Sequence, residues 1–580
     1  MNLIDALQIL KQPAPRDAAV LRVFLACGFT PLHLQTFLAA QLRQQAPQQN
    51  VELKTGLFGD LAGNIERWDA STSDVLVAVI EWQDLDLRLG VRNSGMWRVE
   101  SLPDVFQSVR LALARLERAL KQASSSGRTV CISMPTLPLP PLFSEATYQA
   151  GNAELQLRNL VSSFAASISS VRSVRVVGSQ SVDERSPASA RFDIQSELLA
   201  GFPYQLPHAS ALAGLLAELI KTQCPKKGLI TDLDDTLWAG ILGEVGIEGV
   251  SWHLDQHTQF HGLYQRLLDS LASAGILIGA ASKNDPALVA QAFERKDLIV
   301  SKESIFPIEA HWSQKSESVG RILKTWNIGP EAVVFIDDNV MELAEVQAAF
   351  PEVECLLFPG DDTQAIWNLL KRLRDIFGKS AISKEDSLRL QSIRAAGVLQ
   401  ESVNGHGRSL DDFLRGAGAS IEFDFDKQSR DSRAFELINK TNQFNLNGRR
   451  LTESSWTAYL NDPTSFLMTV SYEDKYGPLG KIAVLLGKIQ RDALHIDSWV
   501  MSCRAFSRRI EHQCLNQLLE RFECEGILFN FAATPRNGPL QEFLAGLLGF
   551  APTAGVCLSR RFFQEKCPPL FHRVKESVHA

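Results

Sequence analysis

Short apolar runs separated by amphipathic stretches dominate the N-terminal part of the chain. Runs at 20–26, 74–80 and 129–134 are bounded by polar residues, glycine or proline, as is typical of buried strands. At 105–122 and 210–222, apolar residues instead recur with the 3.6-residue period of a helix. Alternating strands and helices of this kind predict an α/β layered fold.

The alternation starts again in the middle of the chain and changes towards the C-terminal end. Apolar runs at 229–232, 275–281 and 332–336 predict buried strands of a parallel sheet. After a polar stretch at 378–386, paired strand signals at 465–472 and 481–487 predict a mixed α+β region. We therefore predict an α/β protein of three domains, with these boundaries: 1–222, 223–380 and 381–580.

Composition and charge narrow the class of protein without identifying a function. The chain has 580 residues, 45% hydrophobic and 22% charged, so each predicted domain can bury a core. Its net charge is -7 without a long basic run, which argues against nucleic-acid binding. The absence of an apolar run of about 18 residues and of a secretory leader argues against membrane attachment and secretion. Nine cysteines without a C-x-x-C pair favour reduced thiols, so we expect a cytoplasmic protein.

The candidate chemistry begins where the run at 229–232 ends in a D-x-D-x-T motif formed by Asp232, Asp234 and Thr236. Open α/β sheets bind their ligands at the carboxyl ends of strands. If the strand continued to 234, the two carboxylates would share one face, because side chains alternate along a strand. One carboxylate can attack phosphorus while the other exchanges a proton with the leaving group. The motif therefore points to phosphoryl transfer.

Three further polar clusters follow in order along the chain. They are Ser282-Lys283-Asn284, Lys315 in the segment HWSQK, and Asp337-Asp338-Asn339. Carboxylates from two strand ends supply the hard oxygen ligands that suit Mg²⁺, while a hydroxyl and an ammonium group can hold a phosphoryl group. The alternative is that these acids only cap helices and turns. The short intervals between the clusters leave no room for a large cap domain, so we expect an open site.

The order of these clusters is similar to the four motifs of the haloacid dehalogenase (HAD) superfamily of phosphotransferases. The resemblance implies that Asp232 is the nucleophile and Asp234 the acid/base. It also implies Mg²⁺ as the cofactor, with ligands from Asp232, the backbone carbonyl of Asp234, Asp337 and Asp338. The expected contacts to a small phosphorylated substrate are Thr236, Ser282, Lys283, Lys315 and Asn339.

The amino-acid sequence in and around the motifs is closer still to one branch of that superfamily. The segments DLDDTLWAGILGEVG, ASKND, HWSQKSES and FIDDNVMELAEV resemble the FkbH-like family, as do LINKTNQFNLNGRR, SYEDKYGPLG and IDSWVMSCRAFSRRIE further on. This resemblance implies that a glyceryl unit passes from 1,3-bisphosphoglycerate to an enzyme cysteine. From there it would pass to the phosphopantetheine thiol of an acyl carrier protein, with phosphate removed, for polyketide-type biosynthesis.

The family match makes Cys503, in the segment WVMSCR, the candidate acyl-carrying thiol, with Arg504 and His512 as candidate activators. The alternative is an ordinary buried thiol, which is how most free cysteines are used. The C-terminal region also resembles the GNAT acyltransferase fold. It departs from the phosphate-binding R-x-x-G-x-G pattern at Ser507 and Arg509, and Leu544 stands where a tyrosine is common. We therefore expect a degenerate GNAT scaffold that presents a thiol. The polar run 439–443 is either a solvated helix end or a substrate contact.

The N-terminal part resembles an SGNH-hydrolase-like domain through LFGDLAGNIERWD and LLAGFPY. No serine stands at 26–30, where such a hydrolase has its nucleophile, so we expect a scaffold or carrier-docking module with a structural His208. Two other functions stay open for the whole chain. One is a HAD phosphatase for another phosphorylated metabolite or carrier-bound intermediate, for example in polysaccharide biosynthesis. The other is a scaffold that recruits a carrier protein.

Overall fold

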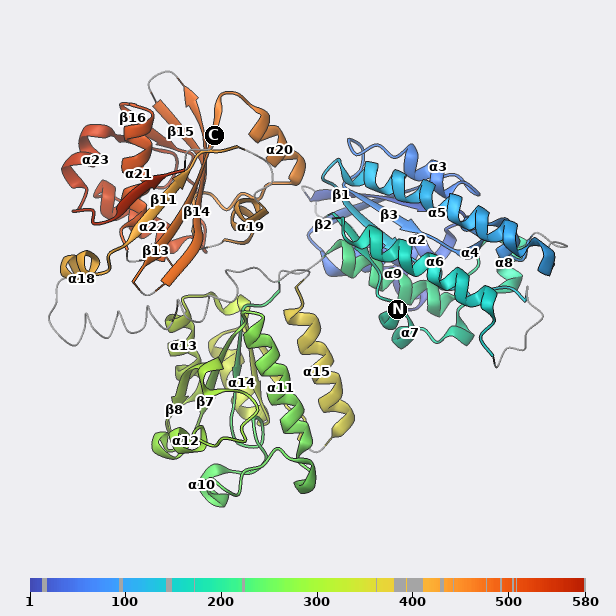
Figure 1. Ribbon diagram of the computed structural model, residues 1–580, viewed down its shortest axis with the longest axis horizontal. Helices are drawn as coiled ribbons and strands as arrows, with labels where there is room; N and C mark the ends of the chain where they lie inside the picture. The colour runs from blue at the N-terminus through green and yellow to red at the C-terminus, as the bar shows by residue number, and fades with distance from the viewer. Residues whose placement is uncertain are drawn as a thin grey trace. The chain divides into compact units, whose positions relative to one another are not determined.

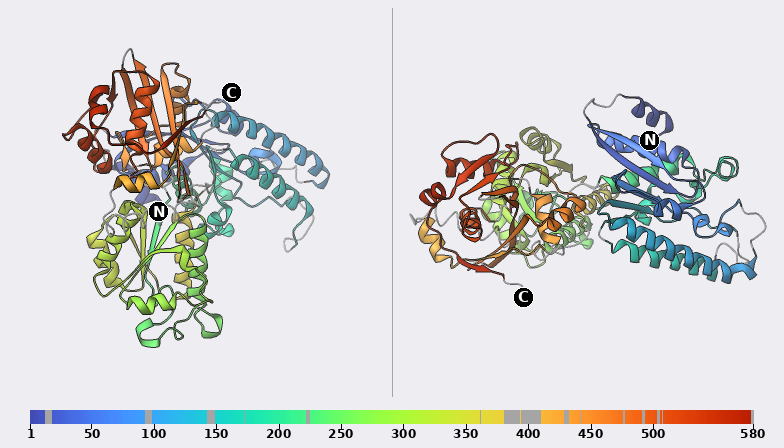
Figure 2. Two further views of the ribbon diagram at one scale, coloured as in Figure 1. Left: turned by 60° about the vertical axis from the view of Figure 1, so that its left-hand side comes forward. Right: turned by 90° about the horizontal axis from the view of Figure 1, so that it is seen from above.

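The computed structural model describes most of the chain (Figure 1, Figure 2). The described residues are 1–12, 18–92, 98–141, 149–171, 173–221, 225–360, 362–379, 393, 410–427, 432–441, 443–475, 477–490, 493–502, 505–506 and 508–577. The chain divides into two compact units, Met1–Gln223 with Thr452–Ser455, and Cys224–Leu451 with Trp456–Ala580. One sheet lies in the first unit and two lie in the second. The finer division into three domains stays a prediction.

The first unit is a parallel sheet in the order β2-β1-β3-β4-β5 with helices on both faces. Its strands are β1 (Ala19–Cys27), β2 (Gln49–Thr55), β3 (Val75–Val79), β4 (Thr129–Ser133) and β5 (Val174–Val176). Its helices are α1 (Leu3–Lys11), α2 (Leu32–Gln45), α3 (Leu61–Glu66), α4 (Trp82–Leu85), α5 (Leu102–Ser124), α6 (Asn152–Ser169), α7 (Ser179–Arg185), α8 (Ile194–Ala200) and α9 (Leu206–Ile220).

Alternate residues of each strand in this sheet face opposite helix layers. Val77 packs with α2 and α9, whereas its neighbours Leu76 and Ala78 pack with α5 and α6. A strand covered on both faces is apolar at every position, which explains why the runs predicted at 20–26, 74–80 and 129–134 are confirmed. The helices predicted at 105–122 and 210–222 begin three and four residues too late. In both, the proline near the true start (Pro103 and Pro207) lies in the first helical turn, where proline is tolerated.

The second sheet is also parallel, in the order β10-β9-β6-β7-β8. Its strands are β6 (Gly228–Thr231), β7 (Leu277–Ser282), β8 (Ile305–Ala310), β9 (Val333–Asp337) and β10 (Glu354–Leu357). Its helices are α10 (Leu242–Val245), α11 (Gln259–Ser273), α12 (Pro286–Ala292), α13 (Lys315–Trp326), α14 (Val340–Ala349) and α15 (Thr363–Phe377). Apolar residues of α11, α12 and α15 pack on one face, and those of α13 and α14 on the other.

Two glycines on neighbouring strands make room for the end of helix α13. A Cβ atom at Gly228 would lie 2.5 Å from the Trp326 ring, and one at Gly279 would lie 2.8 Å from it. Real Cβ atoms do not approach carbon atoms this closely, so only glycine fits under the indole. The Trp326 Nε1 group donates a hydrogen bond to the carbonyl of Phe306 at 2.7 Å. The C-terminal end of α13 is therefore seated in one place on the sheet.

The third sheet is mixed and lies in the C-terminal part of the second unit. Its main path is β17-β16-β15-β14-β13-β11-β18, and β12 pairs with β15. The strands are β11 (Ser420–Asp424), β12 (Phe444–Asn445), β13 (Ser465–Asp474), β14 (Gly477–Gln490), β15 (Ala493–Met501), β16 (Gly526–Phe529), β17 (Val556–Ser559) and β18 (Arg573–Glu576). The helices are α18 (Leu410–Gly416), α19 (Ser432–Lys440), α20 (Glu453–Asn461), α21 (Ile510–Arg521), α22 (Gly538–Leu548) and α23 (Arg560–Lys566). The paired strands predicted at 465–472 and 481–487 are confirmed as the antiparallel pair β13 and β14.

The helices of the described residues include none that is both long and apolar enough to cross a membrane.

Candidate phosphoryl-transfer site

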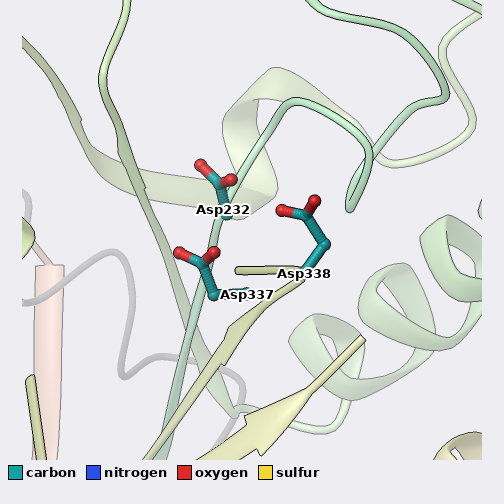
Figure 3. A group of neighbouring side chains, drawn as sticks. All are labelled: Asp232, Asp337 and Asp338. Atoms are coloured by element: carbon teal, nitrogen blue, oxygen red, sulfur yellow. The ribbon is translucent and has the colours of Figure 1, made fainter. Parts of the chain in front are cut away.

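Three aspartates meet at the carboxyl edge of the second sheet. Asp232 follows β6, Asp337 ends β9 and Asp338 comes next, and these two strands are neighbours. One carboxylate oxygen from each residue lies within 4.8 Å of the others. Figure 3 draws the three side chains together. The chain runs from β6 to β7 and from β9 to β10, so the connections that follow these two neighbouring strands lead to opposite edges of the sheet, and doubly wound sheets bind their ligands at such a switch point.

Lys315, the first residue of α13, bridges two of these acids. Its Nζ atom lies 2.9 Å from Asp232 Oδ1 and 2.5 Å from Asp337 Oδ2. All three residues are at most 5% exposed, so little water screens their charges. The prediction placed Lys315 in the site, and the structure brings it into direct contact with the acids there.

Burial dominates the titration of this cluster. Burial raises the pKa of Asp232 to about 7, where Lys315 opposes the rise and Asp337 adds to it. Burial also raises the pKa values of Asp337 and Asp338. Burial alone would lower the pKa of Lys315, but the charges of Asp232 and Asp337 outweigh it and raise that pKa. The cluster therefore has more negative charge than one lysine neutralises, which favours a bound cation.

The donor set of the cluster fits Mg²⁺. Asp232, Asp337 and Asp338 offer carboxylate oxygens, which are hard ligands, and no soft ligand lies in the described cluster. Asp338 is the most exposed of the three, so a hydrated ion can reach the group from solvent. These residues would hold the ion.

Asp234 is held by three donors, but not by the geometry expected from the sequence. The alternation argument required the strand to continue to 234, but β6 ends at Thr231 and Asp235 has a positive φ of 48°. The turn brings the Trp238 Nε1 group and the Leu242 backbone amide to Asp234 Oδ1, at 3.0 and 3.2 Å. The carboxylate is therefore oriented by a turn, and β-strand alternation does not place it beside Asp232.

Asn284 is a site residue to which the sequence analysis assigned no role. Its Nδ2 group donates to Asp234 Oδ2 at 2.8 Å and lies 3.3 Å from Ser282 Oγ. It thereby joins the ends of β6 and β7. Its position two residues after Ser282 was the available signal, but the pairing depends on a turn that the sequence pattern does not predict.

The remaining predicted contacts lie in different surroundings. Ser282 ends β7 and is 3% exposed, and Thr236 is fully buried with no hydrogen-bond partner for Oγ1 among the described residues. Lys283 makes an ion pair with Glu342 on α14 at 2.7 Å. Asn339 caps α14, because its Oδ1 atom accepts from the backbone amide of Met341 at 2.9 Å. The backbone amide of Asn339 donates to Asp337 Oδ1 at 2.9 Å. Asn339 therefore caps a helix, which is the structural role that we left open as an alternative for the acids of these clusters.

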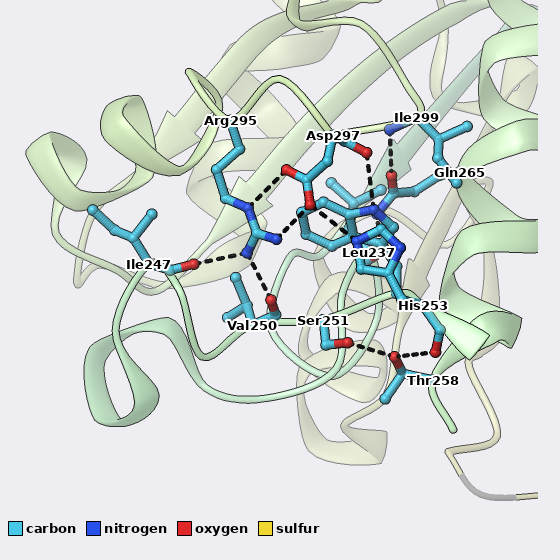
Figure 4. Close-up of polar contacts among 11 residues, drawn as sticks. Leu237, Ile247, Val250, Ser251, His253, Thr258, Gln265, Arg295, Asp297 and Ile299 are labelled. Carbon is cyan, nitrogen blue, oxygen red and sulfur yellow. Dashed lines mark hydrogen bonds and ion pairs between the residues drawn. The ribbon is translucent and has the colours of Figure 1, made fainter. Parts of the chain in front are cut away.

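The segment after the first motif is short and fixed on one side. Residues 238–252 contain α10 and a single bridge between Ala239 and Ser251, in line with the expectation of no large cap. Arg295 donates to the carbonyls of Ile247 and Val250 at 2.8 and 2.7 Å, and it makes two contacts with Asp297 (Figure 4). The same view shows Gln265 between the Leu237 carbonyl and the Ile299 amide. These contacts hold the segment beside the sheet.

The candidates outside this cluster have separate surroundings. His208 is fully buried between the hydroxyls of Ser186 and Thr136, both at 2.9 Å, and burial lowers its pKa to about 3, which agrees with a structural role. Asn439 binds backbone groups of Phe435 and Leu451 at the end of α19. Cys503, Arg504 and Ser507 lie outside the described residues, so the acyl-carrying thiol stays a prediction. His512 is half-buried on α21.

No protein-family model and no curated protein matches the sequence. Among solved structures, the chain is similar to the N-terminal part of BF1531 from Bacteroides fragilis, which contains a phosphatase domain and was crystallised with Mg. The two are 20% identical with a TM-score of 0.52, over 66% of this chain and 100% of that one. At this identity the likeness shows a common fold. S. aureus MnaA with UDP aligns with a TM-score of 0.14 at 9% identity, over 67% of this chain and 98% of that one, which is too low to carry an argument.

Proposed function

We propose that the chain is a Mg²⁺-dependent phosphatase or phosphotransferase of the HAD type. The observation that carries the proposal is the cluster of Asp232, Asp337 and Asp338 with Lys315 between two of them, at the switch point of a parallel sheet. The phosphatase domain and the Mg of the B. fragilis neighbour give independent support for the same chemistry.

The residues of the site divide the chemistry between them. Asp232 attacks phosphorus through a carboxylate oxygen, and Asp234 gives a proton to the departing oxygen. Asp234 then takes a proton from the water that hydrolyses the aspartyl phosphate. Lys315 and Ser282 hold the phosphoryl oxygens, and Asn284 keeps Asp234 in place. Bound Mg²⁺ would neutralise charge shared by the phosphoryl group and the carboxylates.

The finer function that we propose is glyceryl transfer from 1,3-bisphosphoglycerate to an acyl carrier protein for polyketide-type biosynthesis. What supports it is the resemblance of segments around the site and of WVMSCR to the FkbH-like family. In this proposal, the Cys503 thiolate displaces the acyl phosphate of 1,3-bisphosphoglycerate to form a 3-phosphoglyceryl thioester. Asp232 takes over the remaining 3-phosphate and water releases it, and the carrier thiol then displaces Cys503. The carrier's phosphopantetheine arm would be the partner group that reaches the enzyme.

The experiment combines the protein with Mg²⁺, 1,3-bisphosphoglycerate and phosphopantetheinylated carrier proteins, and measures intact masses and free phosphate. A glyceryl increment on the carrier that disappears with Cys503→Ala supports the finer function. Phosphate release without any acyl adduct reduces the proposal to the phosphatase. Full phosphate release by Asp232→Asn, with Asp255→Asn on the surface as the control, would overturn the phosphatase as well.

A further inference from the structure

A cavity of about 490 Å³ lies in the first unit, remote in sequence from the phosphoryl-transfer motifs. Gly28 follows β1 and Asp84 lies shortly after β3, and both line the cavity. Strands β1 and β3 are neighbours in the order β2-β1-β3-β4-β5, whose connections turn to opposite edges at this pair. The cavity therefore occupies the switch point of its sheet, where doubly wound folds bind small molecules. Its volume is that of a small-molecule site.

A buried carboxylate oxygen in this cavity has no partner. Glu197 is 2% exposed and lines the cavity. Its Oε1 atom accepts from Arg92 Nε at 3.0 Å, but Oε2 receives no hydrogen bond from the described residues. A buried acceptor without a donor destabilises the fold, so it persists where a ligand or water supplies the donor.

A second carboxylate, from the half-buried Asp84, lines the same cavity. Asp84 Oδ2 accepts from the Glu81 amide at 2.8 Å, while Oδ1 points at Gly28. A Cβ atom at Gly28 would lie 1.7 Å from Oδ1, so a side chain there would displace the carboxylate. The absence of a side chain at Gly28 thus leaves Asp84 in the cavity wall.

The charges and apolar groups of the wall select the ligand. Asp84, Asp86 and Glu197 carry acid groups, and Arg92 is the one base among the described residues that line the cavity. Arg88 makes an ion pair with Asp86 at 2.6 Å, and Arg92 is engaged by Glu197. An anion such as phosphate would meet carboxylates rather than a free base. Phe58 and Leu87 are 58% and 69% exposed beside these acids and can cover an apolar group.

We infer that this cavity binds a small organic ammonium compound whose N–H groups donate to Asp84 and Glu197 while Phe58 and Leu87 cover its apolar part. An ammonium group supplies several donors together with a positive charge, which suits two carboxyl groups of which only Glu197 is paired with an arginine. The ring of Phe58 adds an attraction for a cation, as its contact with the Arg92 guanidinium at 5.5 Å already shows. This site is independent of the proposed phosphatase.

The test compares three probes that differ only in the polar group: phenethylamine, 2-phenylethanol and phenylacetate. Saturation-transfer NMR with the full chain measures their dissociation constants at about pH 9, because burial raises the pKa of Asp84 to about 8 and the carboxylate is charged above it. We expect phenethylamine to bind saturably and at least about tenfold more tightly than the other two. Equal binding of the alcohol, tighter binding of phenylacetate, or no saturable binding of the amine overturns the inference.

Variants locate the binding and separate it from non-specific attraction. Asp84→Asn and Glu197→Gln keep the shape of each side chain and remove its charge, so each is expected to weaken phenethylamine binding about tenfold. Glu66→Gln, at an exposed ion pair with Arg115 in the same unit, is the matched control and is expected to bind as the natural chain does. Unchanged binding by the Asp84→Asn/Glu197→Gln double variant, with native circular dichroism, contradicts the site.

Discussion

Two parallel sheets of this chain place buried carboxylates at their switch points, but they balance the charge differently. In the second sheet, Asp232 and Asp337 share Lys315, and Asp338 lies within 4.8 Å. In the first sheet, Asp84 and Glu197 share no lysine, and only Glu197 is paired with an arginine. The first arrangement suits a metal ion and a phosphoryl group, and the second suits a donor-rich cation. The group that balances the charge of the carboxylates therefore decides which ligand the carboxyl edge of each sheet can bind.

The largest expected effect tests whether only the second sheet carries phosphoryl chemistry. Asp232→Asn removes the proposed nucleophile and is expected to lower kcat/KM for 4-nitrophenyl phosphate with Mg²⁺ by about a thousandfold or more. Asp84→Asn in the first sheet is expected to leave it unchanged. The comparison fails if the two variants lose similar activity.

The next effect concerns the shared lysine. Lys315→Met leaves Asp232 and Asp337 buried without their counter-charge, so the free energy of unfolding of the second unit is expected to fall by about 3 kcal/mol. Added Mg²⁺ is expected to restore more stability to this variant than to the natural chain. Urea unfolding followed by tryptophan fluorescence measures both. Lys324→Met, at an exposed position of the same helix, is the control, and equal losses in the two variants would contradict the bridging role.

A pH series tests Asp84, the carboxyl group of the first sheet that has no paired arginine or lysine among the described residues. Burial raises the pKa of Asp84 to about 8, and the carboxylates of Glu81 and Glu197 add to the rise. Between about pH 4, where an unfolded aspartate loses its proton, and about pH 8, the unfolded state binds fewer protons. The free energy of unfolding of the first unit therefore falls as the pH rises through this window. Thermal unfolding is expected to show a flatter pH dependence in Asp84→Asn, and an unaltered slope would refute the assignment.

The smallest expected effect separates orientation from chemistry. Asn284→Ala removes the hydrogen bond to Asp234 Oδ2, which is expected to lower kcat/KM about tenfold without removing the nucleophile. Asn368→Ala, at an exposed position of helix α15, is the control. Activity equal to that of the control would show that the turn alone orients Asp234.

The sequence predicted the strands well because both parallel sheets are covered on two faces. Runs such as 332–336 are apolar throughout and end in polar residues, so strand and site emerge from one pattern. Asp232, Ser282, Lys315 and Asp337 were found because each directly follows or ends an apolar run or begins a helix. Strand ends are visible in sequence, and parallel strands bring their ends together.

The contacts made by turns were not predictable in the same way. The positive φ of Asp235 decides which groups reach Asp234, and the D-x-D-x-T pattern is compatible with several turns. The partner of Lys283 depends on the rotation of α14, which places Glu342 within 2.7 Å. The cavity of the first unit joins Gly28, Asp84 and Glu197 from distant parts of the chain, and of these only Gly28 lies in a segment, 26–30, that the sequence analysis singled out.

The packing of Trp326 against Gly228 and Gly279 predicts where loss-of-function mutations arise. Helix α13 has 12 residues and is about 18 Å long, with Trp326 at one end and Lys315 at the other. A methyl group at either glycine displaces the indole and tilts the helix as a lever, so the ammonium group moves away from its acids. A genetic screen for loss of the proposed activity would therefore recover mutations at Gly228 and Gly279, which have no side chain and contact no substrate.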